Sequence, residues 1–322
     1  MFSRVTATSM LSLLLVLAAN GLSGADGSPS VPNVKRIVFL GDSITYSGEY
    51  VATVEAALLL QKPERDYEIV DLGLPSETVS GLSEPGHAGG SFPRPNLHER
   101  LDRVLTKLKP ELVIACYGMN DGIYYPFGND RFAAFSNGIV KLRQKLDKAG
   151  AQIIHLTPPT FDPLPLKGKT LPAGLAEYRK PYEGYDAVLE RYSEWLLAHR
   201  SEGWTVIDIH GPMKAYLQKM REQKPGFTLA GDGVHAGEEG HRVMAEQVLR
   251  AWNLPFPQIS DHLRGLVRKR QRILSDAWLT ETGHARPGMN RGLPLAQALQ
   301  QAEVLKQPIR KEIQAQGTAP AK

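Results

Sequence analysis

Cysteine is almost absent from the sequence: Cys116 is the only one among 322 residues. A single cysteine excludes an intramolecular disulfide and any zinc or iron–sulfur site built on several cysteines. Aromatic residues make up only 7%, and no stretch of about 20 apolar residues is available to span a bilayer. The net charge of +4 is too small by itself to indicate nucleic-acid binding. Glycine and proline, at 30 and 23 residues, are near average usage, which excludes collagen-like and low-complexity chains.

The first 25 residues are predicted to be a cleaved export signal outside the fold. Arg4 supplies a positive charge, Met10–Ala19 is apolar, and Ser23-Gly24-Ala25 has the small residues of a cleavage site. A short N-terminal membrane anchor is the alternative, but the apolar run is too short to span comfortably. No cysteine stands at the cleavage site to carry a lipid. We therefore expect an exported protein, periplasmic or secreted, without stable membrane insertion.

The distribution of charge divides the remaining chain near Pro255-Phe256-Pro257. From Gln258 onward there are 11 basic and 5 acidic residues, whereas residues 26–257 contain 26 basic and 29 acidic ones. We predict a globular body over residues 26–257 and a basic helical extension over residues 258–322. The basic charge of the extension is typical of a solvated helical face, and attraction to an acidic polymer or membrane surface is the alternative.

The body alternates between short apolar runs and longer amphipathic stretches. Runs rich in β-branched and aliphatic residues predict strands at Arg36–Leu40, Tyr67–Leu72, Leu112–Tyr117, Gln152–Thr157 and Thr205–Ile209. Stretches of 3.6-residue periodicity predict helices at Tyr50–Leu60, Leu97–Leu108, Phe132–Leu146, Tyr185–Leu197, His210–Met220 and Glu239–Trp252. This alternation indicates βαβ units. The strands are apolar on both faces, which predicts a parallel sheet covered by helices on either side.

Two helices are predicted in the extension. The first has an apolar stripe that should pack on the body, with partner or polymer binding as the alternative; the stripe comprises Ile259, Leu263, Leu266, Val267, Ile273, Leu274 and Trp278. Residues 283–294 break the pattern, and a weaker helix over Leu295–Ile313 should be interrupted at Pro308. His284, Arg286 and Arg291 in the break are polar enough to reach a neighbouring site.

Loops after strand ends are where parallel sheets hold their ligands, so candidate residues are sought there first. Ser43 follows the first strand, Gly73 the second and Asn120 the third. Each has an ordinary explanation when taken alone. Ser43 could cap a helix, and Gly73 and Asn120 could be turn residues.

Asp232 and His235 stand three residues apart in a glycine-rich loop before a predicted helix. A carboxylate at this spacing could orient the imidazole, and histidine suits general-base chemistry near neutral pH. An ordinary surface pair is the alternative. Combined with a strand-end serine, however, the two residues would supply the base and its orienting group that a serine nucleophile needs.

Four blocks in order resemble the motifs of the SGNH (GDSL-like) hydrolase family: Gly41-Asp42-Ser43, Gly73, Gly118-Met119-Asn120-Asp121 and Asp232-Gly233-Val234-His235. The resemblance spans residues 35–253. It implies a flavodoxin-like three-layer α/β/α sandwich with a five-stranded parallel sheet, and ester hydrolysis through a covalent acyl-enzyme. It implies that Ser43 is the nucleophile, His235 the base and Asp232 its orienting group.

The same resemblance implies an oxyanion hole made by the backbone N–H groups of Ser43 and Gly73 and the side-chain amide of Asn120. It implies no metal and no organic cofactor. The Gly-x-Ser-x-Gly sequence of another large esterase class is absent.

Two polar loops are expected to border the site. The loop Glu84–Pro95 carries His87 and Arg94, which could contact sugar groups, although a structural loop with Arg94 on the surface is the alternative. The loop Pro158–Pro181 and the residue after it supply further rim groups, namely Tyr178, Arg179 and Tyr182. Neither loop resembles an apolar lid for lipid chains. We therefore expect a small-molecule or polysaccharide ester substrate with a short acyl group, in particular acetyl on carbohydrate.

Two alternative functions remain open from the sequence. The nearer one is a lipid or lysophospholipid esterase or a thioesterase. The other is a catalytically dead carbohydrate-binding protein on the same fold, which the complete set of site residues disfavours. The sequence predicts no nucleic-acid partner and leaves the oligomeric state open.

Overall fold

The computed structural model describes residue 31 and residues 33–317, so the predicted export signal lies outside the described residues. Its centre is a sheet of five strands, β1 (Arg36–Gly41), β2 (Glu68–Asp71), β3 (Leu112–Cys116), β4 (Gln152–Leu156) and β5 (Thr205–Ile207). The strands are all parallel and lie in the order β2-β1-β3-β4-β5. Ile37 of β1 pairs with Ile69 of β2 on one side and with Leu112 of β3 on the other. This is the flavodoxin-like order, which confirms the predicted fold class.

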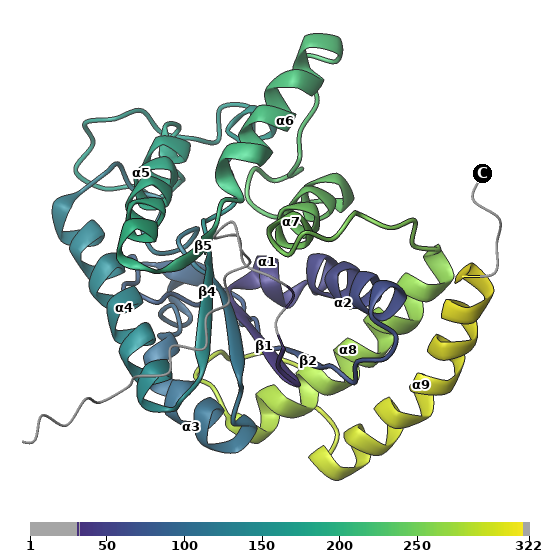
Figure 1. Cartoon of the computed structure of the whole chain (residues 1–322). Coiled ribbons are helices and arrows are strands. Elements are labelled where there is room, and N and C mark those ends of the chain that lie inside the picture. Colours follow the sequence, from purple (N-terminus) through teal and green to yellow (C-terminus); the bar gives the residue numbers. More distant parts are fainter. Residues whose placement is uncertain (1–30, 32, 318–322) are drawn as a thin grey trace, which may run out of the picture.

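Helices cover both faces of the sheet (Figure 1). One face carries α2 (Glu49–Gln61) and α7 (Glu238–Ala251), and the other carries α3 (Leu97–Leu108), α4 (Asn129–Lys148) and α5 (Tyr185–Ala198). Phe135 of α4 stacks on Tyr192 of α5 with 4.3 Å between ring centroids. The side chains of Ile37–Leu40 in β1 are fully buried. Both faces of the central strands are thus buried from solvent, as their uninterrupted apolar sequence requires.

The remaining elements are shorter or lie outside these layers. A one-turn helix α1 (Ser43–Tyr46) follows β1, and α6 (His210–Gln223) follows β5. Three short 3₁₀ segments lie at η1 (His87–Gly90), η2 (Leu164–Leu166) and η3 (His199–Glu202). No helix within residues 33–317 is both long enough and apolar enough to cross a membrane.

The C-terminal helices α8 (Asp261–Thr282) and α9 (Leu295–Gly317) pack on the body and run side by side (Figure 1). Leu263 and Val267 of α8 pack with Ile309 of α9 and with two alanines of α2. The side chain of Gln271 donates a hydrogen bond to the carbonyl oxygen of Ile69 at 3.1 Å. Since β2 is an edge strand, α8 covers backbone that could otherwise pair with another chain.

Helix α9 runs through Pro308 without the interruption expected from the sequence. A proline inside a helix removes one backbone hydrogen bond and is unfavourable by about 3 kcal/mol. Ile309, next to the proline, is buried in the cluster that α9 forms with α2 and α8. Burial of this apolar face on α8 keeps the helix continuous.

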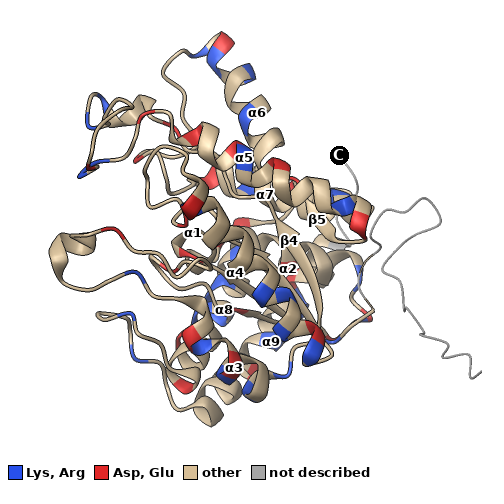
Figure 2. Cartoon of the chain, turned by 90° about the vertical axis from the view of Figure 1, so that its left-hand side faces the viewer, with Lys and Arg blue, Asp and Glu red and all other residues tan. Residues whose placement is uncertain are grey.

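The basic extension meets acidic residues of the body. Ion pairs join Arg264 to Glu238, Arg268 to Glu49, Arg270 to Glu55 and Lys306 to Asp66. The pair of Arg270 and Glu55 is buried, with 2.5 Å between nitrogen and oxygen. On the face in Figure 2, basic and acidic residues lie interspersed and are not separated by sign. The opposite net charges of the two segments are therefore matched where the extension contacts the body.

Candidate active site

Ser43 is the first residue of α1 and is separated from the end of β1 by one residue, Asp42. The residue that caps this helix is Asp42, whose Oδ1 accepts a hydrogen bond from the backbone N–H of Ile44 at 2.9 Å. The capping role considered for Ser43 therefore belongs to its neighbour. The Ser43 hydroxyl oxygen instead lies 2.8 Å from Nε2 of His235.

His235 and Asp232 come from the loop between α6 and α7. Nδ1 of His235 lies 2.6 Å from Oδ2 of Asp232, while Oδ1 accepts the backbone N–H groups of Val234 and His235 at 3.0 and 2.8 Å. With Nδ1–H bonded to the carboxylate, Nε2 is free to accept the proton of Ser43. Partial burial opposes ionisation of Asp232, but these hydrogen bonds outweigh it and lower the pKa of the carboxyl.

Asn120 is buried in the turn after β3, on the other side of the candidate site. Its Nδ2 donates to the carbonyl oxygen of Glu77 at 3.2 Å, and its Oδ1 accepts the hydroxyl of Tyr124 at 3.2 Å. The backbone carbonyl of Asn120 accepts from Ile123, so the residue also serves the turn that its sequence context suggested. The two side-chain contacts leave one N–H of the amide for another acceptor.

Gly73 is engaged elsewhere and does not offer the N–H that the family resemblance implied. Its backbone N–H donates to Oδ1 of Asp71 at 2.8 Å, and both residues are buried. Glycine is needed here for close packing, because an added Cβ would collide with the backbone nitrogen of Tyr46.

Ser76, three residues after Gly73, has the features expected of the backbone donor that the resemblance assigned to Gly73. Sequence reasoning missed it. Its φ of 69° lies in the left-handed region that favours glycine. Within residues 33–317, no group accepts its backbone N–H. Ser76 also precedes Glu77, whose carbonyl contacts Asn120. The positive φ is a property of the folded backbone, and the serine side chain gives no sign of it in the sequence.

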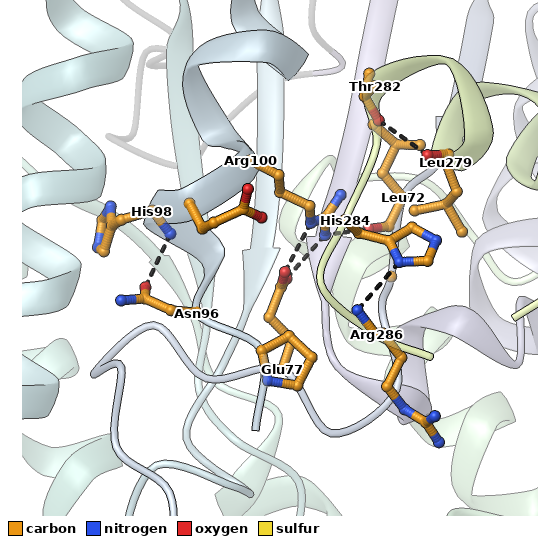
Figure 3. A network of polar contacts seen from close by, with 12 residues as sticks. Leu72, Glu77, Asn96, His98, Arg100, Leu279, Thr282, His284 and Arg286 are labelled. Carbon is orange, nitrogen blue, oxygen red and sulfur yellow. Dashed lines mark hydrogen bonds and ion pairs between the residues drawn. The ribbon is translucent and has the colours of Figure 1, made fainter. Parts of the chain in front are cut away.

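A buried ion pair between Glu77 and Arg100 of α3 supports this side of the site (Figure 3). Nε and Nη2 of Arg100 lie 2.6 and 2.8 Å from the two carboxylate oxygens, and Nη2 also reaches the carbonyl of Leu72 at 2.7 Å. The hydroxyl of Tyr117 donates to the same carboxylate at 2.7 Å. The charged side chains are 0% and 1% exposed. Bidentate pairing fixes Glu77 and with it the carbonyl that holds Asn120.

A cavity of about 650 Å³ adjoins Tyr124. Its walls come from three loops, at residues 84–88, 123–125 and 177–181. Two of these belong to the long polar loops that the sequence placed near the site. The lining mixes charged and polar residues, such as His87 and Arg179, with apolar and aromatic ones, such as Ile123 and Tyr178.

Arg94 is buried, which contradicts the surface position considered for it. Its guanidinium makes two hydrogen bonds of 2.6 Å to the Glu84 carboxylate and lies 5.4 Å from the ring centroid of Tyr124. The same carboxylate lies 3.2 Å from Nδ1 of His87. Only 8% of Arg94 is exposed. Its ion pair with Glu84 braces the cavity wall, a role that a sequence pattern cannot distinguish from sugar binding.

The other predicted rim residues differ in their roles. The hydroxyl of Tyr178 donates to the carbonyl of Pro172, which folds the loop back on itself. The backbone N–H of Tyr182 donates to the carbonyl of Tyr124 at 2.8 Å and so ties this loop to the turn after β3. Arg179 is exposed at the cavity rim.

The break between the two C-terminal helices reaches a loop of the site. The guanidinium of Arg286 lies 4.3 Å from the ring centroid of Phe92, and Nδ1 of His284 accepts the backbone N–H of Arg286 (Figure 3). Arg291 is exposed. The extension therefore packs behind the cavity loop, and His284 lies beside the Glu77–Arg100 pair in the same view.

Beyond the strand ends of a flavodoxin-like sheet, hydrogen bonds join a serine, a histidine and a carboxylate. This combination of fold and site is typical of a class of hydrolases. The chain belongs to the GDSL-like lipase/acylhydrolase family, whose profile matches residues 39–243. The predicted family is thereby confirmed, and the protein is a hydrolase of ester bonds. No curated protein matches the chain.

Solved structures share the fold at low sequence identity. An acetylxylan esterase from Geobacillus stearothermophilus, solved as a catalytic mutant, is 18% identical with a TM-score of 0.53, over 72% of this chain and 100% of that one. A gut microbial diltiazem-metabolizing enzyme is 22% identical with a TM-score of 0.52, over 69% of this chain. The matched part spans 48% of the length of that second enzyme.

Proposed function

We propose that this hydrolase is a serine esterase that removes short acyl groups, above all acetyl, from a carbohydrate. The observation that carries the proposal is the continuous hydrogen-bond chain from Ser43 through His235 to Asp232. A serine hydroxyl is a weak nucleophile until an adjacent base accepts its proton, and this chain supplies one. The lowered pKa of Asp232 keeps its charge available to the imidazolium that forms.

In the proposed reaction, His235 takes the proton of Ser43 as the hydroxyl oxygen attacks the ester carbonyl. Negative charge develops on the carbonyl oxygen, where preorganised donors lower the barrier. The imidazolium then protonates the departing alcohol, and water hydrolyses the acyl-enzyme by the same route. We assign the donors to the backbone N–H groups of Ser43 and Ser76 and to the remaining N–H of Asn120. Ser76 replaces Gly73 in this set because the Gly73 N–H is bonded to Asp71.

The alcohol part of the ester is assigned to the cavity beside Tyr124. Its lining combines tyrosine rings with Glu84, His87, Arg179 and Lys180, a set suited to a polyhydroxylated ligand. Each methylene of a long acyl chain would need apolar surface worth about 0.8 kcal/mol, and charged residues interrupt the apolar surface of this lining. The acetylxylan esterase among the structural neighbours supports the same choice by analogy. Export to the periplasm or the medium is part of the proposal and is based on residues 1–25.

The test of the nucleophile is Ser43→Ala. We expect hydrolysis of p-nitrophenyl acetate to fall by about 10⁴-fold or more. The circular dichroism spectrum and Tm should match those of the parent, because the change removes only one oxygen. Turnover above a tenth of the parent rate would reject Ser43 as nucleophile.

The test of the substrate class is a series of p-nitrophenyl esters from acetyl to octanoyl, together with acetylated xylan. We expect kcat/KM to fall along the series and acetate to be released from the polymer. A rising preference toward octanoyl would favour the lipid alternative. Binding of xylan without release of acid from any ester would favour the dead carbohydrate-binding protein.

A further inference from the structure

Two consecutive residues in the turn after Asn120 have a backbone conformation that side chains disfavour. Ile123 and Tyr124 have φ values of 48° and 59°. A β-branched residue in the left-handed region is a clear outlier, and neither position is a glycine. Such strain persists only where the surrounding structure imposes it, and it is concentrated at functional sites.

Contacts on three sides hold this turn in place. The ring of Tyr124 stacks on Tyr185 with 4.9 Å between centroids, and the guanidinium of Arg94 lies 5.4 Å from the centroid of the Tyr124 ring. The carbonyl of Tyr124 accepts the N–H of Tyr182. The hydroxyl of Tyr185 accepts the N–H of Gly122 at 3.1 Å and donates to Met119 at 2.8 Å. Tyr124 is thus fixed in both backbone and ring.

Held in this position, Tyr124 donates a hydrogen bond from its hydroxyl to Oδ1 of Asn120 at 3.2 Å. An asparagine amide has two N–H donors and one oxygen acceptor. The acceptor is used by Tyr124, and one donor is used by the carbonyl of Glu77. A flipped amide would point its oxygen at the Glu77 carbonyl, so that carbonyl selects the orientation in which Oδ1 faces the Tyr124 hydroxyl. Burial raises the pKa of Tyr124, which keeps the hydroxyl protonated as a donor.

We propose that Tyr124 is a positioning residue of the esterase, which acts through the amide of Asn120. Its hydroxyl donates to Oδ1 and holds the amide in the orientation that the Glu77 carbonyl selects, with the free N–H directed toward the developing oxyanion. Donation to Oδ1 also polarises the amide, and hydrogen bonds in a chain strengthen one another in a low-dielectric interior. The gain is largest when the oxyanion carries charge, so it affects the transition state more than the bound substrate. This inference rests on the proposed function.

The first test is Tyr124→Phe in the full chain, with p-nitrophenyl acetate as substrate. The change keeps the ring and its stacking and removes only the hydroxyl. We expect kcat to fall about 3- to 10-fold, the size expected for one neutral hydrogen bond, with KM unchanged. Tyr192→Phe is the matched control. It removes the hydroxyl of a buried tyrosine of α5 that stacks on Phe135 of α4, and it should leave both kcat and KM unchanged.

The second test is a double-mutant cycle with Asn120→Ala. If Tyr124 acts through the amide, Tyr124→Phe should slow the Asn120→Ala enzyme less than 2-fold, since the group it positions is gone. The same loss in both backgrounds would show that Tyr124 acts independently of Asn120 and would overturn the proposal. A Tm close to that of the parent separates either result from general unfolding.

A third measurement uses a p-nitrophenyl alkylphosphonate, whose phosphoryl oxygen takes the place of the oxyanion when Ser43 attacks. The rate constant of inactivation should fall in Tyr124→Phe by the same factor as kcat. An unchanged inactivation rate would contradict the inference. If Ser43→Ala retained activity, the proposed function itself would fail. If Ser43→Ala were inactive and Asn120→Ala slow, the proposed function would stand. A fully active Tyr124→Phe enzyme would then reject only the role of Tyr124.

Discussion

The two sides of Ser43 are built in opposite ways. On the side of the base, His235 and Asp232 are 52% and 56% exposed, and a span of four residues makes all their mutual contacts. On the side of Asn120, the supporting pair of Glu77 and Arg100 is buried, and its members are 23 residues apart. Half-solvated groups need few protein partners because water completes their hydrogen bonds. Buried polar groups must find every partner within the fold.

The contrast between exposed and buried groups also gives two aspartates near Ser43 different pKa values. Hydrogen bonds outweigh partial burial at Asp232 and lower its pKa. Full burial raises the pKa of Asp42 to about 7, although the N–H of Ile44 stabilises its charge. At neutral pH the carboxyl beside the base is therefore ionised, while the one that caps α1 is about half protonated. Perturbations of the exposed side should alter catalysis alone, and those of the buried side should alter stability as well.

Among changes to the residues on the two sides of Ser43, the largest effect on turnover is expected from Asp232→Asn. The amide cannot hold His235 in the tautomer that leaves Nε2 free, so kcat should fall by about 10⁴-fold. The residue is exposed, so the free energy of unfolding should change by no more than about 0.5 kcal/mol. Steady-state kinetics and urea denaturation of the same preparation check both halves. A kcat within tenfold of the parent would contradict the role of Asp232.

A smaller loss is expected from Asn120→Ala, which removes one oxyanion donor. We expect kcat to fall by about 10²–10³-fold with little change in KM, because the amide acts mainly in the transition state. The measurement is steady-state kinetics with p-nitrophenyl acetate. If KM rose while kcat was maintained, Asn120 would instead be a residue that binds the ground-state substrate.

The buried pair itself is tested by Arg100→Met. Removal of the cation leaves the Glu77 carboxylate buried with Tyr117 alone, so unfolding should become easier by about 3–5 kcal/mol. Glu77→Met in the same chain removes the stranded charge and should recover much of this loss. Urea denaturation of the three proteins gives the comparison. Equal stability of Arg100→Met and the parent would show that the pair does not support this side.

The pair on the exposed side could be predicted from sequence because its mutual contacts are local, although its contact with Ser43 spans 192 residues. Asp232 and His235 are three residues apart, and Ser43 directly follows a strand whose apolar sequence is unmistakable. The buried side depends on contacts across the chain. Nothing near Glu77 in the sequence indicates that Arg100 will face it, and the left-handed turns at Ser76 and Ile123 carry no glycine to reveal them.

The fold shows the same division. The strands follow from apolar runs alternating with helical periodicity, which are local patterns, and their flavodoxin-like arrangement was implied by the family resemblance. The continuity of α9 through Pro308 and the burial of Arg94 follow from tertiary packing, which outweighs local preference. Gly73 was assigned to the oxyanion hole through the family resemblance, but its N–H donates to Oδ1 of Asp71.

The last expected effect is a pH dependence of stability that comes from Asp42. Burial raises its pKa from the usual 3.8 to about 7, so the folded chain keeps a proton that the unfolded chain releases. The stability that the neutral carboxyl contributes is fully present below about pH 4 and is lost as the pH rises toward 7. Between about pH 5 and pH 8, Asp42→Asn should therefore lose less stability than the parent, since its amide can accept the Ile44 hydrogen bond without ionising. Urea denaturation at both pH values checks this, with the exposed Asp147→Asn as a control that should follow the parent. An equal loss in the parent and in Asp42→Asn would mean that Asp42 is already ionised in the fold, and the contrast between the two aspartates would be wrong.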